Sequence, residues 1–148
     1  MSTTNSNLTQ LYMAHLRIQW AQRRSGRPGT GQRRLARAYK HRARLYDERD
    51  EAELAISDYS KAIRLYPYDG TVYVRRGLAR ALNGNYEAAV EDCAKAIRMN
   101  PEDAEAYFIC GLANERLGNL QRAKQDFLKA FELAPDDPEI GEKARRYG

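Results

Sequence analysis

The fold is decided by residues 104–137, which read AEAYFICGLANERLGNLQRAKQDFLKAFELAPDD. The preceding 34 residues, 70–103, read GTVYVRRGLARALNGNYEAAVEDCAKAIRMNPED and carry similar residue types in the same places. Residues 36–69 form a further copy, so the chain contains a tandem repeat with a 34-residue period. Positions that hold one residue type in all three copies include Tyr39, Tyr73 and Tyr107; Ala55, Ala89 and Ala123; Asp58, Asp92 and Asp126; Lys61, Lys95 and Lys129; Ala62, Ala96 and Ala130; Pro67, Pro101 and Pro135; and Asp69, Asp103 and Asp137.

Each copy has the pattern of two short helices joined by a turn. Apolar residues in the second half of each copy follow the i, i+3, i+4, i+7 spacing of an amphipathic helix. Turn signals at 83–85 and 118–119 separate the two halves, and a proline ends each copy. The first copy turns at 50–51 without a glycine, so we expect a tighter or less regular turn there. One helix pair cannot bury its own apolar stripe, and the copies must therefore stack.

The pattern resembles the tetratricopeptide repeat: a large aromatic, a small residue four later, alanine followed four later by a large residue, and a closing proline. In the third copy these slots hold Tyr107, Gly111, Ala123, Phe127, Ala130 and Pro135. The resemblance implies an all-α fold, an α-solenoid of three helix-turn-helix repeats in a right-handed superhelix. We expect these repeats at 36–69, 70–103 and 104–137.

Further segments flank the repeats. Residues 8–24 have apolar residues at every fourth position and predict an N-terminal helix, and glycines then predict a basic linker over 25–35. Residues 1–35 would thus form a basic helix and linker that folds into the groove, packs on the first repeat or clamps a neighbouring molecule. Residues 138–148 predict a short C-terminal helix that partly caps the array, begun by the N-cap signal Asp137-Pro138.

The motifs favour a binding protein over an enzyme. His15 and His41 have no Cys, Asp or Glu in the helical register that a metal or catalytic site needs. Cys93 and Cys110 occupy core slots of the repeat and are expected to be small buried hydrophobes. The glycine pair at 26–31 lacks the Lys and Ser/Thr of a phosphate-binding loop. We therefore expect no catalytic residue, no metal and no cofactor.

The resemblance also implies a ligand-binding groove. In the family, the first helices of successive repeats line a concave surface with their second, fifth, sixth and ninth positions. On this sequence those positions include Arg37, Lys40, His41, Arg44, Thr71, Val74, Arg75, Leu78, Glu105, Phe108, Ile109 and Leu112. The set grades from basic to apolar, which favours a protein or peptide partner with acidic and bulky apolar residues. We expect the last repeat's Phe108, Ile109 and Leu112 to be exposed and to need cover.

Some co-chaperones of this family hold the acidic C-terminal tail of a heat-shock chaperone with Lys, Asn, Asn, Lys and Arg. Only Lys40 matches that set, because Arg44 and Arg75 stand where Asn is expected. Glu105 and Ile109 stand where Lys and Arg are expected, and the reversed charge at Glu105 argues against that ligand.

Two more arginines, Arg76 and Arg80, occupy slots that the family usually fills with Leu and Tyr. Their positions are semi-buried in the resemblance. Two accounts fit them: the side chains snorkel to solvent, or another group covers them.

Charge is uneven along the chain. Residues 1–46 contain ten Lys or Arg and no acid, whereas residues 47–148 hold fifteen bases and all twenty acids. The basic arm consists of Arg17, Arg23, Arg24, Arg27, Arg33 and Arg34.

This arm supports three further hypotheses beside an adaptor that binds a protein. It would anchor an RNA- or ribosome-associated factor, contact anionic lipid, or thread into a larger assembly as part of a structural subunit. No apolar run approaches the ~18 residues of a membrane span, and the oligomeric state stays open. We expect a cytoplasmic protein, although an acid-free, Arg-rich start also resembles a mitochondrial transit peptide.

Overall fold

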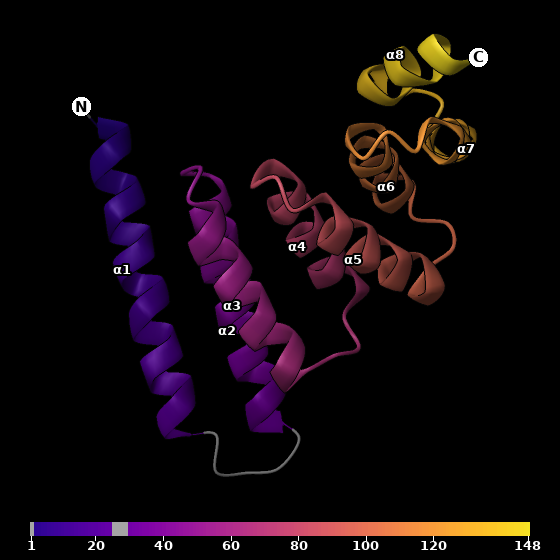
Figure 1. The fold of residues 1–148 in the computed structure, drawn as a ribbon. Coiled ribbons are helices and arrows are strands. Elements are labelled where there is room, and N and C mark those ends of the chain that lie inside the picture. Colours follow the sequence, from indigo (N-terminus) through magenta and orange to yellow (C-terminus); the bar gives the residue numbers. More distant parts are fainter. Residues whose placement is uncertain (1, 25–29) are drawn as a thin grey trace. The chain divides into compact units, whose positions relative to one another are not determined.

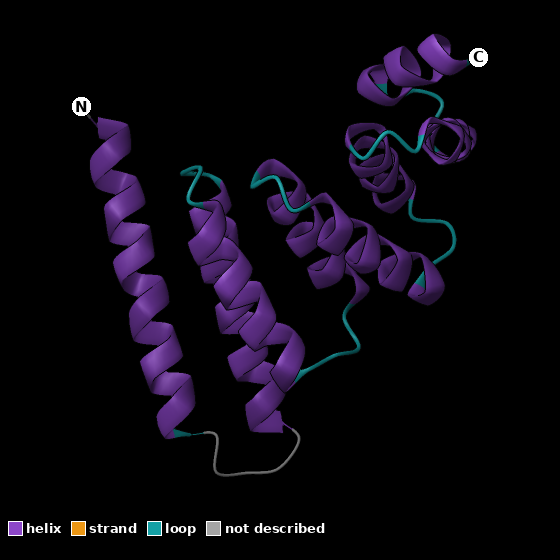
Figure 2. Ribbon diagram, viewed as in Figure 1, coloured by secondary structure: helices purple, strands orange, loops and turns teal. Residues whose placement is uncertain are grey.

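The computed structural model describes residues 2–24 and 30–148, and all regular structure within them is helical (Figures 1 and 2). The helices are α1 (Ser2–Arg23), α2 (Thr30–Asp47), α3 (Ala52–Leu65), α4 (Gly70–Leu82), α5 (Tyr86–Met99), α6 (Ala104–Arg116), α7 (Leu120–Leu133) and α8 (Pro138–Tyr147). The predicted all-α fold is therefore confirmed, with α2–α3, α4–α5 and α6–α7 as the three helix pairs and α1 and α8 as the flanking helices.

The chain divides into two compact units, residues 1–72 and residues 73–148. The boundary lies near the start of α4, so the first unit is formed by α1, α2 and α3 and the second by most of α4 together with α5 to α8.

In the first unit, α1 packs on α2 and α2 packs on α3. Ile18 and Ala21 of α1 are buried against Leu35 of α2. Leu35 belongs to the segment 25–35 that the sequence predicts as a linker. That prediction is wrong for residues 30–35, which form the start of α2. Burial of Leu35 on α1 explains the early start, because tertiary packing stabilises a helix more than local propensity does. The remainder of that linker, 25–29, lies outside the described residues.

The three helix pairs turn in the same way. Asp50, Gly84 and Gly118 occupy equivalent positions and adopt left-handed backbone conformations, with φ of 56°, 84° and 78°. The same two backbone hydrogen bonds recur in each turn, such as Glu51 N–H to Tyr46 O at 3.0 Å in the first. The less regular turn expected in the first repeat is thus wrong: an aspartate adopts there the conformation that glycine adopts elsewhere.

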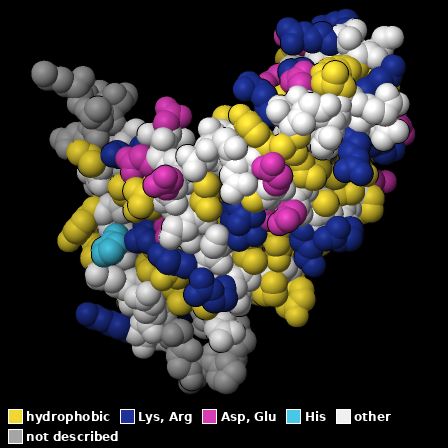
Figure 3. Space-filling model, in the orientation of Figure 1, with side chains coloured by type: hydrophobic (Ala, Val, Ile, Leu, Met, Phe, Trp, Pro, Cys, Tyr) yellow, Lys and Arg dark blue, Asp and Glu magenta, His cyan; other side chains and the backbone are white. Residues whose placement is uncertain are grey.

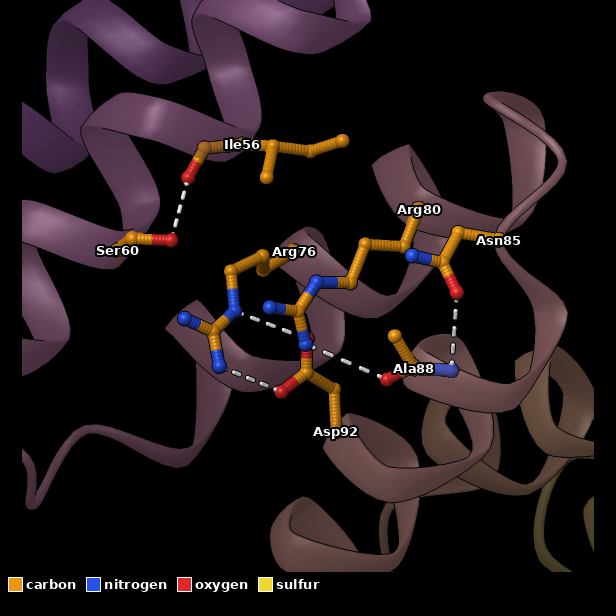
Figure 4. A network of polar contacts seen from close by, with 7 residues as sticks. All are labelled: Ile56, Ser60, Arg76, Arg80, Asn85, Ala88 and Asp92. Atoms are coloured by element: carbon orange, nitrogen blue, oxygen red, sulfur yellow. Dashed lines mark hydrogen bonds and ion pairs between the residues drawn. The ribbon is translucent and has the colours of Figure 1, made fainter.

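Buried ion pairs join the two helices of the first and second repeats. Arg42 donates two hydrogen bonds to Asp58, at 2.6 and 2.9 Å, and Asp58 is 2% exposed. In the second repeat, Arg76 and Arg80 converge on the buried Asp92, at 2.7 and 2.8 Å (Figure 4). Arg76 and Arg80 stand at the positions where the family pattern has Leu and Tyr, and the Asp92 carboxylate compensates the charge of both.

The third repeat keeps the aspartate but not the arginines. Cys110 and Asn114 stand in the two arginine slots, and Asn114 Nδ2 donates to Asp126 at 2.9 Å. Burial raises the pKa of Asp126, which the Asn114 hydrogen bond and the charge of Arg122 only partly offset. Cys93 and Cys110 are both buried, as the sequence predicts, and their thiols lie next to each other. Hydrogen bonding with Cys110, together with burial, raises the pKa of the Cys93 thiol.

Helix α8 caps the last repeat. Asp137 accepts hydrogen bonds from the backbone N–H groups of Glu139 and Ile140, at 3.0 Å each, so the N-cap prediction is confirmed. Ile140 is buried with Phe127 in the core of the second unit. Lys143 and Tyr147 fasten the cap by donating to the two carboxylate oxygens of Glu115 on α6, at 2.6 and 2.7 Å.

Candidate functional site

The basic residues predicted for the groove of the first repeat lie in two hollows of the first unit. Arg37 and Lys40 line a hollow of about 280 Å³ with residues of α3 and of the loop before α4. His41 and Arg44 instead line a hollow of about 620 Å³ between α2 and the residues Thr9, Gln10, Met13 and Arg17 of α1. The N-terminal helix thus packs on the first repeat, which is one of the three arrangements the sequence leaves open.

The side chain of Lys40 makes its polar contacts within the first unit. Its ammonium group donates to Asp69 Oδ2 at 2.8 Å and to Thr71 Oγ1 at 2.6 Å, at the start of α4. Burial would raise the pKa of Asp69, but the hydrogen bonds from Lys40 and Thr71 lower it overall, so the pair is ionised at neutral pH. Lys40 therefore offers a ligand less charge than its exposed neighbour Arg37 does.

Aromatic rings complete the smaller hollow. Tyr66 and Tyr68 lie in its wall, with ring centroids 5.6 Å apart, and Tyr68 is 75% exposed. The guanidinium carbon of Arg33 lies 4.9 Å from the centre of the Tyr66 ring. With Arg33 and Arg37 at its edge, this hollow suits an anionic group.

The second unit has an apolar hollow of about 580 Å³ between α4, α6 and α8. Its lining residues are Leu78, Leu82, Ala104, Glu105, Phe108, Ile109, Leu112, Ala134, Asp137, Glu139 and Ile140. Leu82 is 76% exposed, and Leu78 and Leu112 are half-buried. The acids Glu105, Asp137 and Glu139 contribute the charge of this hollow, so it combines an apolar interior with negative charge.

Three predicted groove residues are less accessible than expected. Phe108 and Ile109 are 8% and 1% exposed, so the expected exposed patch is wrong and both form the floor of the apolar hollow. Phe108 packs on Phe127 at 5.8 Å between ring centroids and shares a core cluster with Ile140, because α8 covers the end of the last repeat. Val74 is 2% exposed and lines neither this hollow nor the two basic ones.

Charged groove residues of the second unit face each other. Arg75 Nη1 lies 3.5 Å from Glu105 Oε1, and both side chains are more than 40% exposed, at 41% and 48%. An exposed pair of this kind contributes little to stability, so either partner remains available to a ligand.

Sequence reasoning missed several lining residues, including Tyr66, Tyr68, Leu82 and Glu139. They lie outside the four first-helix positions that the family pattern assigns to the ligand. For three of them the signal is an apolar or aromatic side chain next to a helix-breaking residue. Tyr66 and Tyr68 lie on either side of Pro67 at the end of the first repeat, and Leu82 precedes the glycine turn inside the second repeat.

The part of the chain that the structure describes holds no group of three or more His, Cys, Asp or Glu side chains arranged for a metal ion. None of the helices described in it has the length and apolar character needed to cross a bilayer.

Comparison with known proteins agrees with the fold. The family model described as "Tetratricopeptide repeat" matches residues 41–99 and 74–138. No curated protein sequence matches the chain. Solved structures of such domains do match. The first TPR of Spaghetti (RPAP3), bound to the HSP90 peptide SRMEEVD, is 27% identical with a TM-score of 0.73, over 76% of this chain and 89% of that one.

Two further structures are similar. The second TPR domain of human RPAP3, in complex with the HSP70 peptide SGPTIEEVD, is 27% identical with a TM-score of 0.71, over 76% of this chain and 93% of that one. The Arabidopsis OM64 TPR domain is 24% identical with a TM-score of 0.76, over 78% and 96% of the two chains, a likeness of fold alone. The family model covers most of the three helix pairs, and the structural matches agree with it. The chain therefore belongs to the tetratricopeptide-repeat family, a scaffold for protein interactions.

Proposed function

We propose that the chain is an adaptor that captures a peptide segment of a partner protein in the apolar hollow of the second unit. The observation that carries this proposal is the accessible Leu78, Leu82 and Leu112 above a buried floor of Phe108 and Ile109. A preformed hollow with a rigid apolar floor can bury a bulky side chain without reorganising first.

Charge around this hollow indicates which residues flank the captured side chain. Glu105, Asp137 and Glu139 favour a Lys or Arg beside the bulky apolar residue. The basic hollow of the first unit, with Arg33 and Arg37, favours an acidic group instead. The preferred partner therefore carries an apolar anchor with a basic neighbour, and acidic residues elsewhere in its sequence.

Chaperone tails are a poor match for this surface, although similar structures hold them. Glu105 stands where the clamp of such co-chaperones has a cation, and it would repel the acidic end of such a tail. Lys40 matches the clamp, but Asp69 already compensates its charge. We infer that SRMEEVD binds this chain weakly.

Selection from a displayed library of random peptides on the full-length protein tests the proposal. Enriched peptides are expected to share a bulky apolar residue next to Lys or Arg. Leu82→Asp should weaken their binding at least about tenfold, as expected for a buried anchor contact. Glu105→Lys should shift the selected flanking residue from basic to acidic.

Leu120→Asp is the matched control, because Leu120 is exposed on α7 and does not line the hollow. The proposal fails if Leu82→Asp and Leu120→Asp bind the selected peptides equally well, or if no motif is enriched. A structural subunit of a larger assembly would instead self-associate when isolated, which sedimentation of the purified chain detects.

A further inference from the structure

Helix α1 has two apolar faces. Ala14, Ile18 and Ala21 form the face that is buried in the first unit. Residues at every fourth position form an exposed outer face: Leu8, Tyr12, Leu16 and Trp20, which are 55%, 63%, 37% and 47% exposed. The first two members of this face, Leu8 and Tyr12, also line a hollow with Arg42 and Tyr46 of α2. Four large apolar residues in one row on the surface form a contiguous patch, which on a protein marks a contact site.

Positive charge surrounds one end of this outer face. The guanidinium carbons of Arg24 and Arg34 lie 4.5 and 5.5 Å from the centre of the Trp20 ring. Arg23 lies seven residues after Leu16 and therefore on the same side of the helix. In Figure 3, hydrophobic side chains reach the surface along the edge where Figure 1 places α1, with basic side chains near them and acidic side chains toward the upper part of that side.

Negative charge is missing from this part of the chain. The sequence has no Asp or Glu before Asp47, so all of α1 and most of α2 are free of acids. Glu48, just after α2, lines a hollow with Thr9 and Met13 near the other end of α1, so the positive charge is concentrated at the Trp20 end. An exposed apolar row with aromatic members and a basic end matches the chemistry of an anionic lipid surface, where apolar groups enter the headgroup boundary and cations meet phosphates.

We propose that the outer face of α1 docks the protein on anionic membrane surfaces. The helix lies flat in the interface, with Leu8, Tyr12, Leu16 and Trp20 in the lipid and Arg23, Arg24 and Arg34 against the headgroups. The buried face stays packed on α2, so docking needs no unfolding of the first unit. The arrangement is peripheral.

Two other occupants fit the face less well. A nucleic acid needs the arginines and can stack on Trp20, but it gains nothing from exposed aliphatic side chains such as Leu8 and Leu16. A second copy of the chain would cover the apolar row but would bring two acid-free, arginine-rich helices together, and like charges oppose that contact.

Vesicle binding of the full-length protein tests the proposal, with Trp20 as the reporter because it is the only tryptophan. Phosphatidylcholine vesicles that contain about one third phosphatidylglycerol should shift its emission to the blue and carry the protein in flotation. Pure phosphatidylcholine should do neither, and raising the salt concentration should release the protein, since lipid charge is screened.

The decisive variant is Leu8→Ser with Leu16→Ser, which removes two lipid contacts and leaves every arginine in place. Its affinity for the anionic vesicles should fall about tenfold or more. Leu120→Ser with Leu128→Ser is the matched control, since those leucines are 56% and 39% exposed and lie on another helix. Circular dichroism should show unchanged helix content in both.

Three results would overturn the proposal. Equal binding to neutral vesicles would remove the role of charge, and equal vesicle binding by the two double variants would remove the role of the apolar row. Failure to bind either kind of vesicle would overturn the proposal outright. If the protein then binds a labelled RNA in a salt-sensitive way, the basic arm is assigned to nucleic acid. Dimerisation in sedimentation that Leu8→Ser with Leu16→Ser abolishes would assign the face to a second copy.

Discussion

Asp50 occupies the turn position that glycine fills in the other two repeats, and it adopts the same left-handed backbone conformation with φ of 56°. A side chain disfavours this conformation, although aspartate tolerates it better than most residues. We expect Asp50→Gly to raise the free energy of unfolding by about 0.5–1 kcal/mol. Chemical denaturation of the full chain measures this change.

The reciprocal variant provides the control. Gly84 has a φ of 84°, and nothing lies within 4 Å of a Cβ added there, so Gly84→Asp would introduce backbone strain without a clash. It should therefore lower stability by an amount similar to the gain at Asp50. If Asp50→Gly proves neutral or destabilising, the aspartate side chain stabilises that turn by a contact that outweighs the backbone strain.

The Arg42–Asp58 pair lies between the two helices of the first repeat, with Asp58 2% and Arg42 12% exposed. Removing only the cation leaves a buried carboxylate whose remaining charged partner, Lys61, is 3.5 Å away and partly exposed. We expect Arg42→Met to cost about 2–4 kcal/mol, close to the loss seen when one member of a buried pair is removed. Thermal unfolding of the full chain measures the loss.

The double variant separates the charge from the packing. Arg42→Met combined with Asp58→Leu removes both charges and should recover most of the stability, because no uncompensated carboxylate then remains buried. An equal loss in the single and double variants would show that the hydrocarbon stem of Arg42, and not its charge, stabilises the repeat.

At this scale the repeat pattern predicted burial where it assigns a core slot, since Cys93 and Cys110 are both buried. It did not predict the partners of Arg76 and Arg80. Asp92 lies more than ten residues away in sequence on the other helix of the pair, and one sequence carries no signal for such a contact. Burial of Ile109 was missed for the same reason, because neighbouring helices decide it.

The attachment of α8 to α6 depends on a carboxylate, Glu115, and is therefore sensitive to pH. Burial would raise the pKa of Glu115, but the hydrogen bonds from Lys143 and Tyr147 lower it overall from its ordinary value of 4.5. A carboxyl whose pKa is lowered in the folded state stabilises the fold above its unfolded pKa and loses that contribution as the pH falls through its folded pKa. We therefore expect α8 to loosen in acid.

Glu115→Gln tests this expectation. At neutral pH the variant should be less stable by about 1–2 kcal/mol, because the charge-assisted hydrogen bonds are lost. The difference from the unmodified chain should shrink as the pH falls below 4.5, the ordinary pKa of the carboxyl, and through the lower folded pKa. Unfolding midpoints measured across acid and neutral pH give both values, and a constant difference at all pH values would contradict the assigned role.

Asp126 is the matched comparison, since its pKa is shifted in the opposite direction. Its raised folded pKa means that its contribution favours the fold at low pH and is lost as the pH rises through that value. Asp126→Asn should thus leave stability unchanged or higher at neutral pH, whereas Glu115→Gln lowers it.

Element boundaries followed from the sequence wherever a cap or a turn glycine sets them. The N-cap at Asp137 and the turns at Gly84 and Gly118 are local signals, and the structure agrees with them. The start of α2 was placed too late because the segment around Gly31 looks like a linker, and packing of Leu35 on α1 outweighs that local signal.

At the scale of the whole molecule, the 34-residue period was enough to predict the family and the number of repeats. The candidate site was only partly predictable, because the repeat pattern locates only the first-helix positions. It does not predict that α8 covers Phe108, or that α1 forms a separate hollow with His41 and Arg44, away from Arg37 and Lys40. Flanking helices fall outside the period, so their contacts cannot be inferred from it.

A repeat chain that divides into two compact units should respond locally to a local defect, since each repeat contacts only its neighbours. A Cβ added at Gly111 would lie 2.7 Å from the ring of Phe127, in the centre of the second unit. Gly111→Ala should therefore force α6 and α7 apart and cost about 1–3 kcal/mol. At Gly77 the added Cβ would meet Cys93 Sγ at 3.1 Å, a milder contact, so Gly77→Ala should cost less.

Hydrogen exchange on the full chain, followed by mass spectrometry, shows where that loss appears. In the Gly111→Ala variant, amides of α6 and α7 should exchange faster by the factor that the stability loss implies, about tenfold for each 1.4 kcal/mol. Amides of α2 and α3 should keep their protection, because they belong to the first unit. Equal acceleration in α2 and α3 would mean that the two units unfold as one cooperative body, and the stability of the first unit would then depend on the packing at Gly111.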